Sequence, residues 1–419
     1  MPYEPTTNFV DSDDVDLGKK LVTKDYLLEV YGTILENSPA SGLVVTPELW
    51  AMGNGFFTGK LGTNTGTVAT PVGVFGGGTN WKQVSASFVH TAAVKTDGTL
   101  WVWGNPGEGQ LGTNDTTPER TIPVTTFAGG NDWKSVSCGF RHTAAIKTDG
   151  SLWVWGKNSD FAQLGTNDTT NRNTPVTTFA GGNNWKQVKC GQYHTAAIKT
   201  DGSLWVWGSN GGGWLGINAG GTRSTPVTTF AGGNDWKQVS AGGGNTAAIK
   251  TDGSLWIWGT NNGGRLGANI ASNFADKNTP LTTFAGGTNW KSVECGSGLN
   301  AAIKTDGSLW IWGRNDVGAL GINLPAGGDR RTPVTTFAGG NNWKQISGGS
   351  SYCMAIKTDG TLWGWGNNSA ADSARTGNLG INLAVDPITP VTTFAGGNNW
   401  KSVSAGEGNT QAIKSVDYI

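Results

Sequence analysis

One motif returns along most of the chain at intervals of 51 to 57 residues, and this repetition restricts the fold more than any other feature. Its clearest copy, WKSVSCGFRHTAAIKTDGSLWVW, occupies residues 133–155. The Trp-Lys pair that opens it occurs seven times, at Trp81, Trp133, Trp185, Trp236, Trp290, Trp343 and Trp400. Repeats of about 50 residues are typical of propellers and solenoids, in which one supersecondary unit packs on the next. The sequence therefore predicts a repeat architecture.

Each repeat contains four segments with the pattern of short β-strands. TAAIK alternates small or apolar with polar positions, and LWVWG is a second such run. The turn between them reads Thr-Asp-Gly-Ser, as at residues 148–151, and Asp-Gly between apolar strands is a strong hairpin signal because glycine accepts a positive φ. WKSVS before the hairpin and TPVTTF after it predict two further strands. The unit is then a four-stranded antiparallel sheet, which has the size of one propeller blade.

The two ends of the repeated region complete each other. Leu-Trp pairs also occur seven times, but no Trp-Lys segment precedes the first, at Leu49, and no Leu-Trp pair follows the last Trp-Lys segment, at Trp400. We therefore expect strands from residues 400–414 to join strands from residues 43–75 in one shared blade. Sharing a blade closes the ring and removes the exposed sheet edges of an open array. The predicted fold is an all-β, seven-bladed β-propeller of four-stranded antiparallel blades.

The wording of the repeat resembles that of a known family. The segment GFRHTAAIKTDGSLWVWGKNSDFAQLG, residues 139–165, is similar to the repeat of the regulator of chromosome condensation family, whose members form seven-bladed propellers. The resemblance covers about residues 43–414. It does not extend to the residues that carry two known activities of that family. No hairpin insertion resembles the wedge with which the nuclear exchange factor engages its GTPase. Phe140 stands where the plant ultraviolet-B receptor of this fold carries tryptophan ahead of Arg-His-Thr.

Composition argues against several classes of function. Lysine plus arginine and aspartate plus glutamate both number 30, so there is no basic surplus for binding nucleic acid. Cys138, Cys190 and Cys295 share one repeat position that other repeats fill with alanine or glycine, which predicts a small packed side chain and no disulfide framework. Neither a signal peptide nor an apolar run suited to membrane insertion is evident, so we expect a soluble protein made in a cytoplasm.

Residues 1–42 lack the repeat, and we expect them to form an N-terminal arm of the propeller, which would span residues 43–419. Residues 1–20 suit an extended segment, TKDYLLEVYG suits a short helix with Thr23 as N-cap, and residues 36–42 suit a linker. A helix this short must dock on something to be stable. The phrase VDLGKKLVTKDYLLEVY, residues 15–31, resembles N-terminal segments of structural proteins in tailed-phage virions. The predicted anchor residues are Leu17, Leu21, Tyr26, Leu27, Val30 and Tyr31.

Comparison among the repeats separates two kinds of connection. The Asp-Gly turn and the FAGGNNW segment, as at residues 179–185, hardly change, whereas the loop before the histidine position and the loop after LWVWG change greatly. In an up-and-down blade alternate connections lie at the same end, so the propeller should have a uniform face and a variable face. Loops on a rigid scaffold commonly carry recognition, and we expect the variable face to bind. Its candidate contact residues are Phe56, Phe57, Phe88, Phe140, Arg141, Phe161, Tyr193, Trp214 and Phe274.

We expect no catalytic, metal or cofactor site. His90, His142 and His194 occupy equivalent positions in three neighbouring repeats, but such positions are too far apart to share one ion at about 2 Å. In the family that the chain resembles, this histidine serves structure. The recurring aspartates, such as Asp149, belong to hairpin turns, and no GxSxG, phosphate-loop or Cys-x-x-Cys motif occurs.

These observations predict a noncatalytic structural and interaction protein of a phage virion, such as a tail, fibre or decoration component. Residues 1–35 would bind other virion proteins, and the variable face would bind a host surface protein or glycan. We expect the protein in the virion after its synthesis in the host cytoplasm. Two alternatives stay open: a soluble regulatory propeller that binds a protein partner, and a host-glycan-binding module that uses Trp214 and Phe57.

Overall fold

The computed structural model describes residues 15–16, 21–22, 45–55, 59–64, 66–75, 78–271, 275–368, 377–383 and 385–417. The chain divides into two compact units, residues 1–46 with 416–419 and residues 47–415. In the first unit, β1 (Val15–Asp16) pairs antiparallel with β2 (Leu21–Val22), a pairing that the prediction of an extended segment did not include.

The predicted short helix, its N-cap Thr23 and the linker lie outside the described residues. Leu21, one of the six predicted anchor residues, lies in β2. The other five lie outside the described residues: Leu17, Tyr26, Leu27, Val30 and Tyr31.

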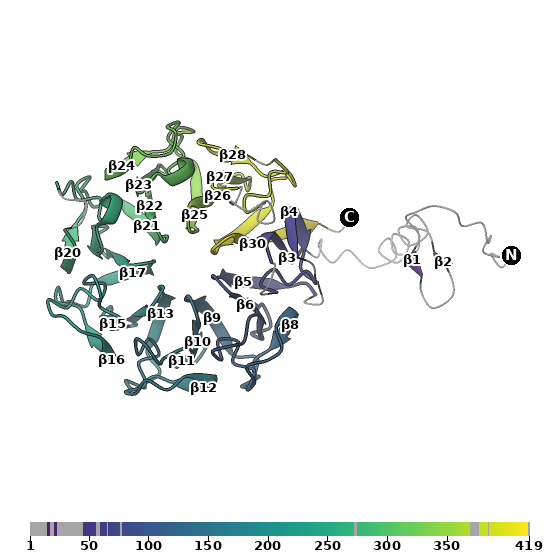
Figure 1. Ribbon diagram of the computed structural model, residues 1–419, viewed down its shortest axis with the longest axis horizontal. Coiled ribbons are helices and arrows are strands. Elements are labelled where there is room, and N and C mark those ends of the chain that lie inside the picture. Colours follow the sequence, from purple (N-terminus) through teal and green to yellow (C-terminus); the bar gives the residue numbers. More distant parts are fainter. Residues whose placement is uncertain are drawn as a thin grey trace, which may run out of the picture. The chain divides into compact units, whose positions relative to one another are not determined.

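Residues 47–415 form seven four-stranded antiparallel sheets arranged in a ring, which we number as blades 1 to 7 (Figure 1). In blades 1 to 6 the first strand lies nearest the centre of the ring and the fourth lies outermost (Figure 1). The strands of blades 1 to 3 are β5 (Trp81–Ala86), β6 (His90–Lys95), β7 (Leu100–Gly104) and β8 (Arg120–Thr125); β9 (Trp133–Cys138), β10 (His142–Lys147), β11 (Leu152–Gly156) and β12 (Arg172–Thr177); and β13 (Trp185–Cys190), β14 (His194–Lys199), β15 (Leu204–Gly208) and β16 (Arg223–Thr228).

Blades 4 to 6 repeat this order. Their strands are β17 (Trp236–Ala241), β18 (Asn245–Lys250), β19 (Leu255–Gly259) and β20 (Lys277–Thr282); β21 (Trp290–Cys295), β22 (Leu299–Lys304), β23 (Leu309–Gly313) and β24 (Arg330–Thr335); and β25 (Trp343–Gly348), β26 (Tyr352–Lys357), β27 (Leu362–Gly366) and β28 (Val391–Thr392). Two short 3₁₀ helices, η1 (Asn262–Gly264) and η2 (Asp316–Gly318), lie in the loops between the third and fourth strands of blades 4 and 5.

Blade 7 combines the two ends of the repeated region. Its strand order is β29 (Trp400–Ala405), β30 (Asn409–Asp417), β3 (Val45–Asn54) and β4 (Thr67–Gly73). Figure 1 shows the purple β3 and β4 beside the yellow β30. The predicted shared blade, and with it the predicted seven-bladed all-β fold, is confirmed.

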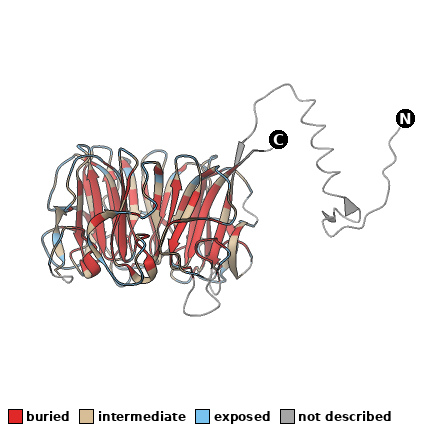
Figure 2. Ribbon diagram, turned by 90° about the horizontal axis from the view of Figure 1, so that it is seen from above, coloured by how far each residue is buried: buried red, intermediate tan, exposed pale blue. Residues whose placement is uncertain are grey.

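The hydrophobic core lies between the blades. At the junction of blades 2 and 3, Ile146 and Val154 of blade 2 pack with Trp185 and Trp207 of blade 3, and an equivalent cluster fills each of the seven junctions. Because a blade is covered on both sides, its middle strands are buried almost throughout (Figure 2). The tryptophan of each Trp-Lys pair and the second tryptophan of the LWVWG strand in blades 1 to 6 are buried in these junctions.

At six of the seven junctions, a glycine in the loop after the third strand lets the next blade's tryptophan approach. The indole N–H of Trp207 donates to the Gln163 carbonyl at 2.9 Å, across the junction of blades 2 and 3. Gly165 has a φ of +66°, and a Cβ at this position would lie 2.7 Å from Trp207 Cδ1. A larger residue would meet both a strained backbone and a fixed ring. The Leu-Gly pair of each repeat thus serves packing between blades.

One buried threonine hydroxyl in each of blades 1 to 6 offers a route to higher stability. Thr178 is 3% exposed, and its hydroxyl has no hydrogen-bond partner among the described residues; blade 7 carries Val74 at the equivalent position, packed against the core. We expect Thr178→Val to raise the free energy of unfolding by about 1 kcal/mol, because it removes an unpaired buried polar group. Urea denaturation measures this. Thr177→Val, at the exposed neighbouring position, should change stability by less than about 0.5 kcal/mol. A loss of stability in Thr178→Val would contradict the assignment.

Candidate ligand-binding face

The strand order places the two kinds of loop on opposite faces of the propeller. In blade 2 the variable loops, residues 139–141 and 157–171, connect the first strand to the second and the third to the fourth. The uniform connections, residues 148–151 and 178–184, leave the opposite ends of the same strands. Since neighbouring strands are antiparallel, the predicted variable face and uniform face both exist.

Five aromatic side chains form one continuous band on the variable face, which we call the aromatic arc. The rings of Phe88 and Phe140 stack with centroids 4.6 Å apart, and the Phe140 and Tyr193 centroids are 5.6 Å apart. Tyr193 in turn contacts Phe161 at 4.6 Å and stacks on Trp214 at 6.3 Å. All five are only partly buried. The arc therefore runs across the loops of blades 1 to 3, and each of its five residues stays partly exposed.

A hydrogen bond and an ion pair hold the arc in place at two points, Trp214 and Phe140. The indole N–H of Trp214 donates to Thr260 Oγ1 of blade 4 at 2.9 Å. The guanidinium of Arg141 lies 5.4 Å from the Phe140 ring centre and pairs with Glu108 of blade 1 at 3.2 Å. Such supports fix the rotamers of the rings, so a partner would meet a preorganised surface.

The structure thus brings six of the nine candidate contact residues together. These are Phe88, Phe140, Arg141, Phe161, Tyr193 and Trp214. The other three, Phe56, Phe57 and Phe274, lie outside the described residues. Sequence comparison found the residues of the arc but not their mutual contacts, because Phe88, Tyr193 and Trp214 occupy three different repeat positions.

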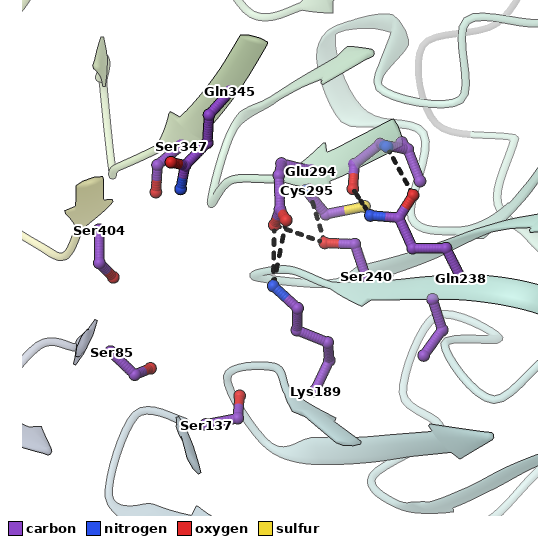
Figure 3. A network of polar contacts seen from close by, with 12 residues as sticks. Ser85, Ser137, Lys189, Gln238, Ser240, Glu294, Cys295, Gln345, Ser347 and Ser404 are labelled. Atoms are coloured by element: carbon purple, nitrogen blue, oxygen red, sulfur yellow. Dashed lines mark hydrogen bonds and ion pairs between the residues drawn. The ribbon is translucent and has the colours of Figure 1, made fainter. Parts of the chain in front are cut away.

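A cavity of about 170 Å³ lies at the centre of the ring, lined by the ends of the first strands and by the loops that follow them. One repeat position supplies seven of the side chains that line it, which Figure 3 shows around a single opening. In chain order this position holds Ser85, Ser137, Lys189, Ser240, Glu294, Ser347 and Ser404. Each serine hydroxyl accepts a hydrogen bond from the backbone of the next blade, as Ser137 does from Cys190 N–H at 3.0 Å. These bonds tie the blades together around the cavity.

Lys189 and Glu294 break the serine pattern and form an ion pair inside the cavity. Lys189 Nζ lies 3.1 Å from Glu294 Oε1, and the Ser240 hydroxyl donates to Glu294 Oε2 at 3.1 Å (Figure 3). The pair therefore links blades 3 and 5 across blade 4. Its side chains are 33% and 26% exposed, so its contribution to stability is modest, at about 0 to 1 kcal/mol. The sequence analysis missed this pair, although comparison of the seven repeats at this one position would have indicated it.

The cysteines that line the cavity and the histidines between the blades have structural roles. Burial raises the pKa of the Cys190 and Cys295 thiols to about 12, so both stay protonated at neutral pH.

His90, His142 and His194 are fully buried, and each Nε2 lies 2.8 to 3.0 Å from a threonine hydroxyl of the next blade. Each threonine hydroxyl donates to a backbone carbonyl, so the histidine Nε2–H is the donor. These histidines are therefore neutral links between neighbouring blades.

Comparison with known proteins identifies the repeat. The family model described as the regulator of chromosome condensation (RCC1) repeat matches residues 97–146, 149–198, 201–249, 252–303 and 306–356, which is more than half of the chain. The chain belongs to the RCC1 repeat family. This confirms the family resemblance seen in the repeat wording.

The chain is also similar to curated relatives in sequence and to solved structures in fold. It is 31% identical to the ultraviolet-B receptor UVR8 of Arabidopsis thaliana, over 79% of this chain and 74% of UVR8. It is 27% identical to the human E3 ubiquitin-protein ligase HERC2, but that match spans only 6% of HERC2. The structure of human WBSCR16 has a TM-score of 0.74 at 21% identity, covering 88% of this chain and 99% of that one. Yeast RCC1 (Prp20), bound to Kap60, has a TM-score of 0.77 at 18% identity, covering 100% and 96%. These two structures share the fold.

The comparisons give the phage resemblance of residues 15–31 no support. None of the relatives named above is described as a virion protein. Most of that segment also lies outside the residues that the structure describes. Placement in a virion therefore stays a prediction. Within the described part of the chain, no helix is long and apolar enough to cross a membrane.

Proposed function

We propose that this chain is a noncatalytic scaffold that binds a protein partner on its variable face. The observation that carries the proposal is the aromatic arc: five partly exposed rings in mutual contact on the face whose loops differ most among the repeats. Aromatic residues and arginine are enriched at the centres of protein interfaces, where they supply most of the binding energy. Of the functions considered from the sequence, the protein-binding regulatory propeller agrees best with this surface.

The surroundings of the arc suit a protein ligand. Glu108 pairs with Arg141 at 3.2 Å and accepts a hydrogen bond from the Asn171 amide at 2.9 Å, which gives the outer side of the arc a polar rim. A hydrophobic centre with a polar rim is the usual composition of such interfaces. Yeast RCC1 (Prp20) has the same fold. It is described as bound to Kap60 in one structure, and another structure is described together with its binding to Gsp1p and histones. Proteins with this fold thus bind other proteins.

Substitution within the arc tests the proposal. We expect the double variant Tyr193→Ser, Trp214→Ser to weaken binding of the natural partner by about tenfold or more, because buried aromatic residues dominate interface energies. The partner is first captured from the native source with the full chain, and its Kd is then measured with purified proteins. Phe179→Ser on the uniform face is the matched control, since it makes a similar change on a 63% exposed side chain. Loss of binding in the control, with the arc variant unaffected, would contradict the proposal.

The remaining predictions have separate tests. Membership of a virion requires that the protein sediment with phage particles, and that a variant without residues 1–35 stay in the supernatant. Glycan binding requires a signal on a glycan array that Trp214→Ala abolishes. If either result were obtained without a protein partner for the arc, it would replace the proposed function.

A further inference from the structure

The uniform face carries a ring of exposed phenylalanines that the propeller does not need for its core. One phenylalanine per blade begins the uniform connection after the fourth strand, and each is 60% to 66% exposed. They are Phe75, Phe127, Phe179, Phe230, Phe284, Phe337 and Phe394. The residue before each is inward and mostly buried, as Thr178 is. An apolar side chain left exposed in all seven blades points to a surface that contacts something apolar.

The backbone fixes these rings at one level. The N–H of Phe179 donates to the Gly165 carbonyl at 2.9 Å, and equivalent bonds from phenylalanine to glycine at 2.8 to 2.9 Å recur in every blade. Since the seven positions are structurally equivalent, the seven side chains leave the same face at a common height. They are separated from one another by the polar Asp-Gly turns and Gly-Gly connections of the uniform face. The face thus presents separate apolar anchors rather than one continuous patch.

Lysines give the same face a positive charge. The lysine of each Trp-Lys pair is exposed, from Lys82 in blade 1 to Lys401 in blade 7. A second lysine per blade lies over two tryptophan rings, as Lys199 does at 4.7 Å from Trp185 and 4.6 Å from Trp205. The second tryptophan of each such pair is itself partly exposed. Tryptophan and lysine are the side chains that settle at the boundary between water and lipid.

The charge of the uniform face differs from that of the whole chain. Among the side chains that the structure describes, these fourteen lysines share the uniform face with nine acidic side chains, a surplus of five positive charges. The nine are Glu48, Asp97, Asp132, Asp149, Asp201, Asp235, Asp252, Asp306 and Asp359. The chain as a whole carries 30 basic and 30 acidic residues, so charge is segregated to this face. A positive face matches an anionic partner.

We propose that the uniform face docks on the surface of an anionic lipid bilayer. A fluid bilayer accepts separate apolar anchors wherever they lie, provided they share one depth, whereas a protein partner would need pockets at seven matching places. Peripheral binding combines buried apolar area with attraction between lysines and anionic headgroups, and the face offers both. Docking of this kind requires no membrane-spanning segment. It would hold the variable face, with its aromatic arc, away from the membrane.

Vesicle binding tests this inference with the full chain. We expect the protein to cosediment with vesicles of phosphatidylcholine containing about 30% phosphatidylserine, and about tenfold less with phosphatidylcholine alone. Binding should also fall about tenfold when the salt is raised to about 0.5 M, because the lysine contribution is screened. In vesicles with brominated acyl chains, tryptophan fluorescence should be quenched, since the partly exposed tryptophans of the uniform face would lie near the lipid.

Matched variants locate the contact. The triple variant Phe179→Ser, Phe230→Ser, Phe284→Ser removes three adjacent anchors and should lower the partition coefficient about tenfold or more, since interfacial binding scales with buried apolar area. Phe140→Ser, Tyr193→Ser in the aromatic arc should leave it unchanged. Because the substituted phenylalanines are exposed, the thermal unfolding midpoint should stay near that of the wild type, which separates lost binding from lost folding. No binding to either kind of vesicle, or equal binding by the triple variant, would overturn the inference. Retention on an acidic polypeptide without vesicle binding would also overturn it and indicate a protein partner.

Discussion

Lowering the pH from 7 to about 4.5 is expected to unfold the propeller, because three buried histidines must stay uncharged in the folded state. Burial lowers the pKa of His90 and His142 to about 3 and that of His194 to about 4. Within the described residues, the Nδ1 atoms of His142 and His194 have no hydrogen-bond partner, so a proton added there would find no acceptor. Protonation therefore favours the unfolded chain.

The sign and the pH window follow from these values. Below the ordinary histidine pKa of 6.5 the unfolded chain binds protons that the folded chain does not bind. The free energy of unfolding therefore falls as the pH falls. Each histidine should remove about 1.4 kcal/mol per pH unit, and the three together about 4 kcal/mol per pH unit, between pH 6.5 and about 4. The turn aspartates act in a different window. Hydrogen bonds from Ser203 lower the pKa of Asp201 below its ordinary value of 3.8, so its contribution is lost only in stronger acid.

Asparagine substitutions test the histidine account. Asn245 and Asn409 fill the equivalent position in blades 4 and 7, so His142→Asn copies a residue that the fold already accepts. We expect this variant to reduce the slope of unfolding free energy against pH by about a third, and the triple histidine variant to abolish most of it. Urea denaturation at several pH values between 5 and 7 measures the slope. An unchanged slope in the triple variant would show that other groups cause the acid sensitivity.

Alanine at the Asp-Gly turn of blade 3 is expected to destabilise the propeller by about 3 to 5 kcal/mol, because two separate constraints require glycine there. Gly202 has a φ of +83°, which disfavours any side chain, and a Cβ would lie 2.1 Å from the Asn234 carbonyl oxygen. The Gly202 carbonyl also accepts the N–H of Trp236, the first residue of blade 4, at 3.0 Å. A shift that relieves the clash would therefore disturb the start of the next blade.

Gly181 provides the matched control for this prediction. It too has a positive φ, of +52°, but a Cβ there would have no atom within 4 Å. Gly181→Ala should therefore lose only about 1 kcal/mol, from the backbone strain alone. Differential scanning calorimetry of the two variants separates the effect of the clash from the effect of φ. Equal destabilisation would contradict the role assigned to the contact with Asn234.

The repeat made most of the fold predictable from the sequence. A strand pattern that recurs seven times fixes each strand, and the unmatched segments at Leu49 and Trp400 require the shared blade. The turn at Gly202 was expected from hairpin chemistry, but its contact with Asn234 was not, because that contact joins one blade to the connection leading into the next. Local sequence predicts the strands of a blade well and the contacts between blades poorly.

The candidate site was predictable only as a set of residues. Variation among the loops indicated Tyr193 and Trp214, yet their stacking depends on the conformations of two separate loops of blade 3. Comparison of the repeats could have indicated Lys189 and Glu294 as unusual residues but not their contact, which joins blades that are not adjacent in the ring. The sequence did not indicate that the phenylalanines of the uniform face are exposed, because they occur in every repeat. A residue such as Phe179 that recurs in every repeat resembles a core residue until its exposure is known.

Photocrosslinking from the aromatic arc tests the proposed protein-binding function most directly. Benzoylphenylalanine replaces Phe140 in one sample and Phe179, on the uniform face, in another, and each is irradiated with the captured partner. The account predicts that the partner crosslinks from position 140 and not from position 179, and that Tyr193→Ser, Trp214→Ser reduces the crosslink. Crosslinking from position 179 alone, or from neither position while the partner stays bound, would contradict it.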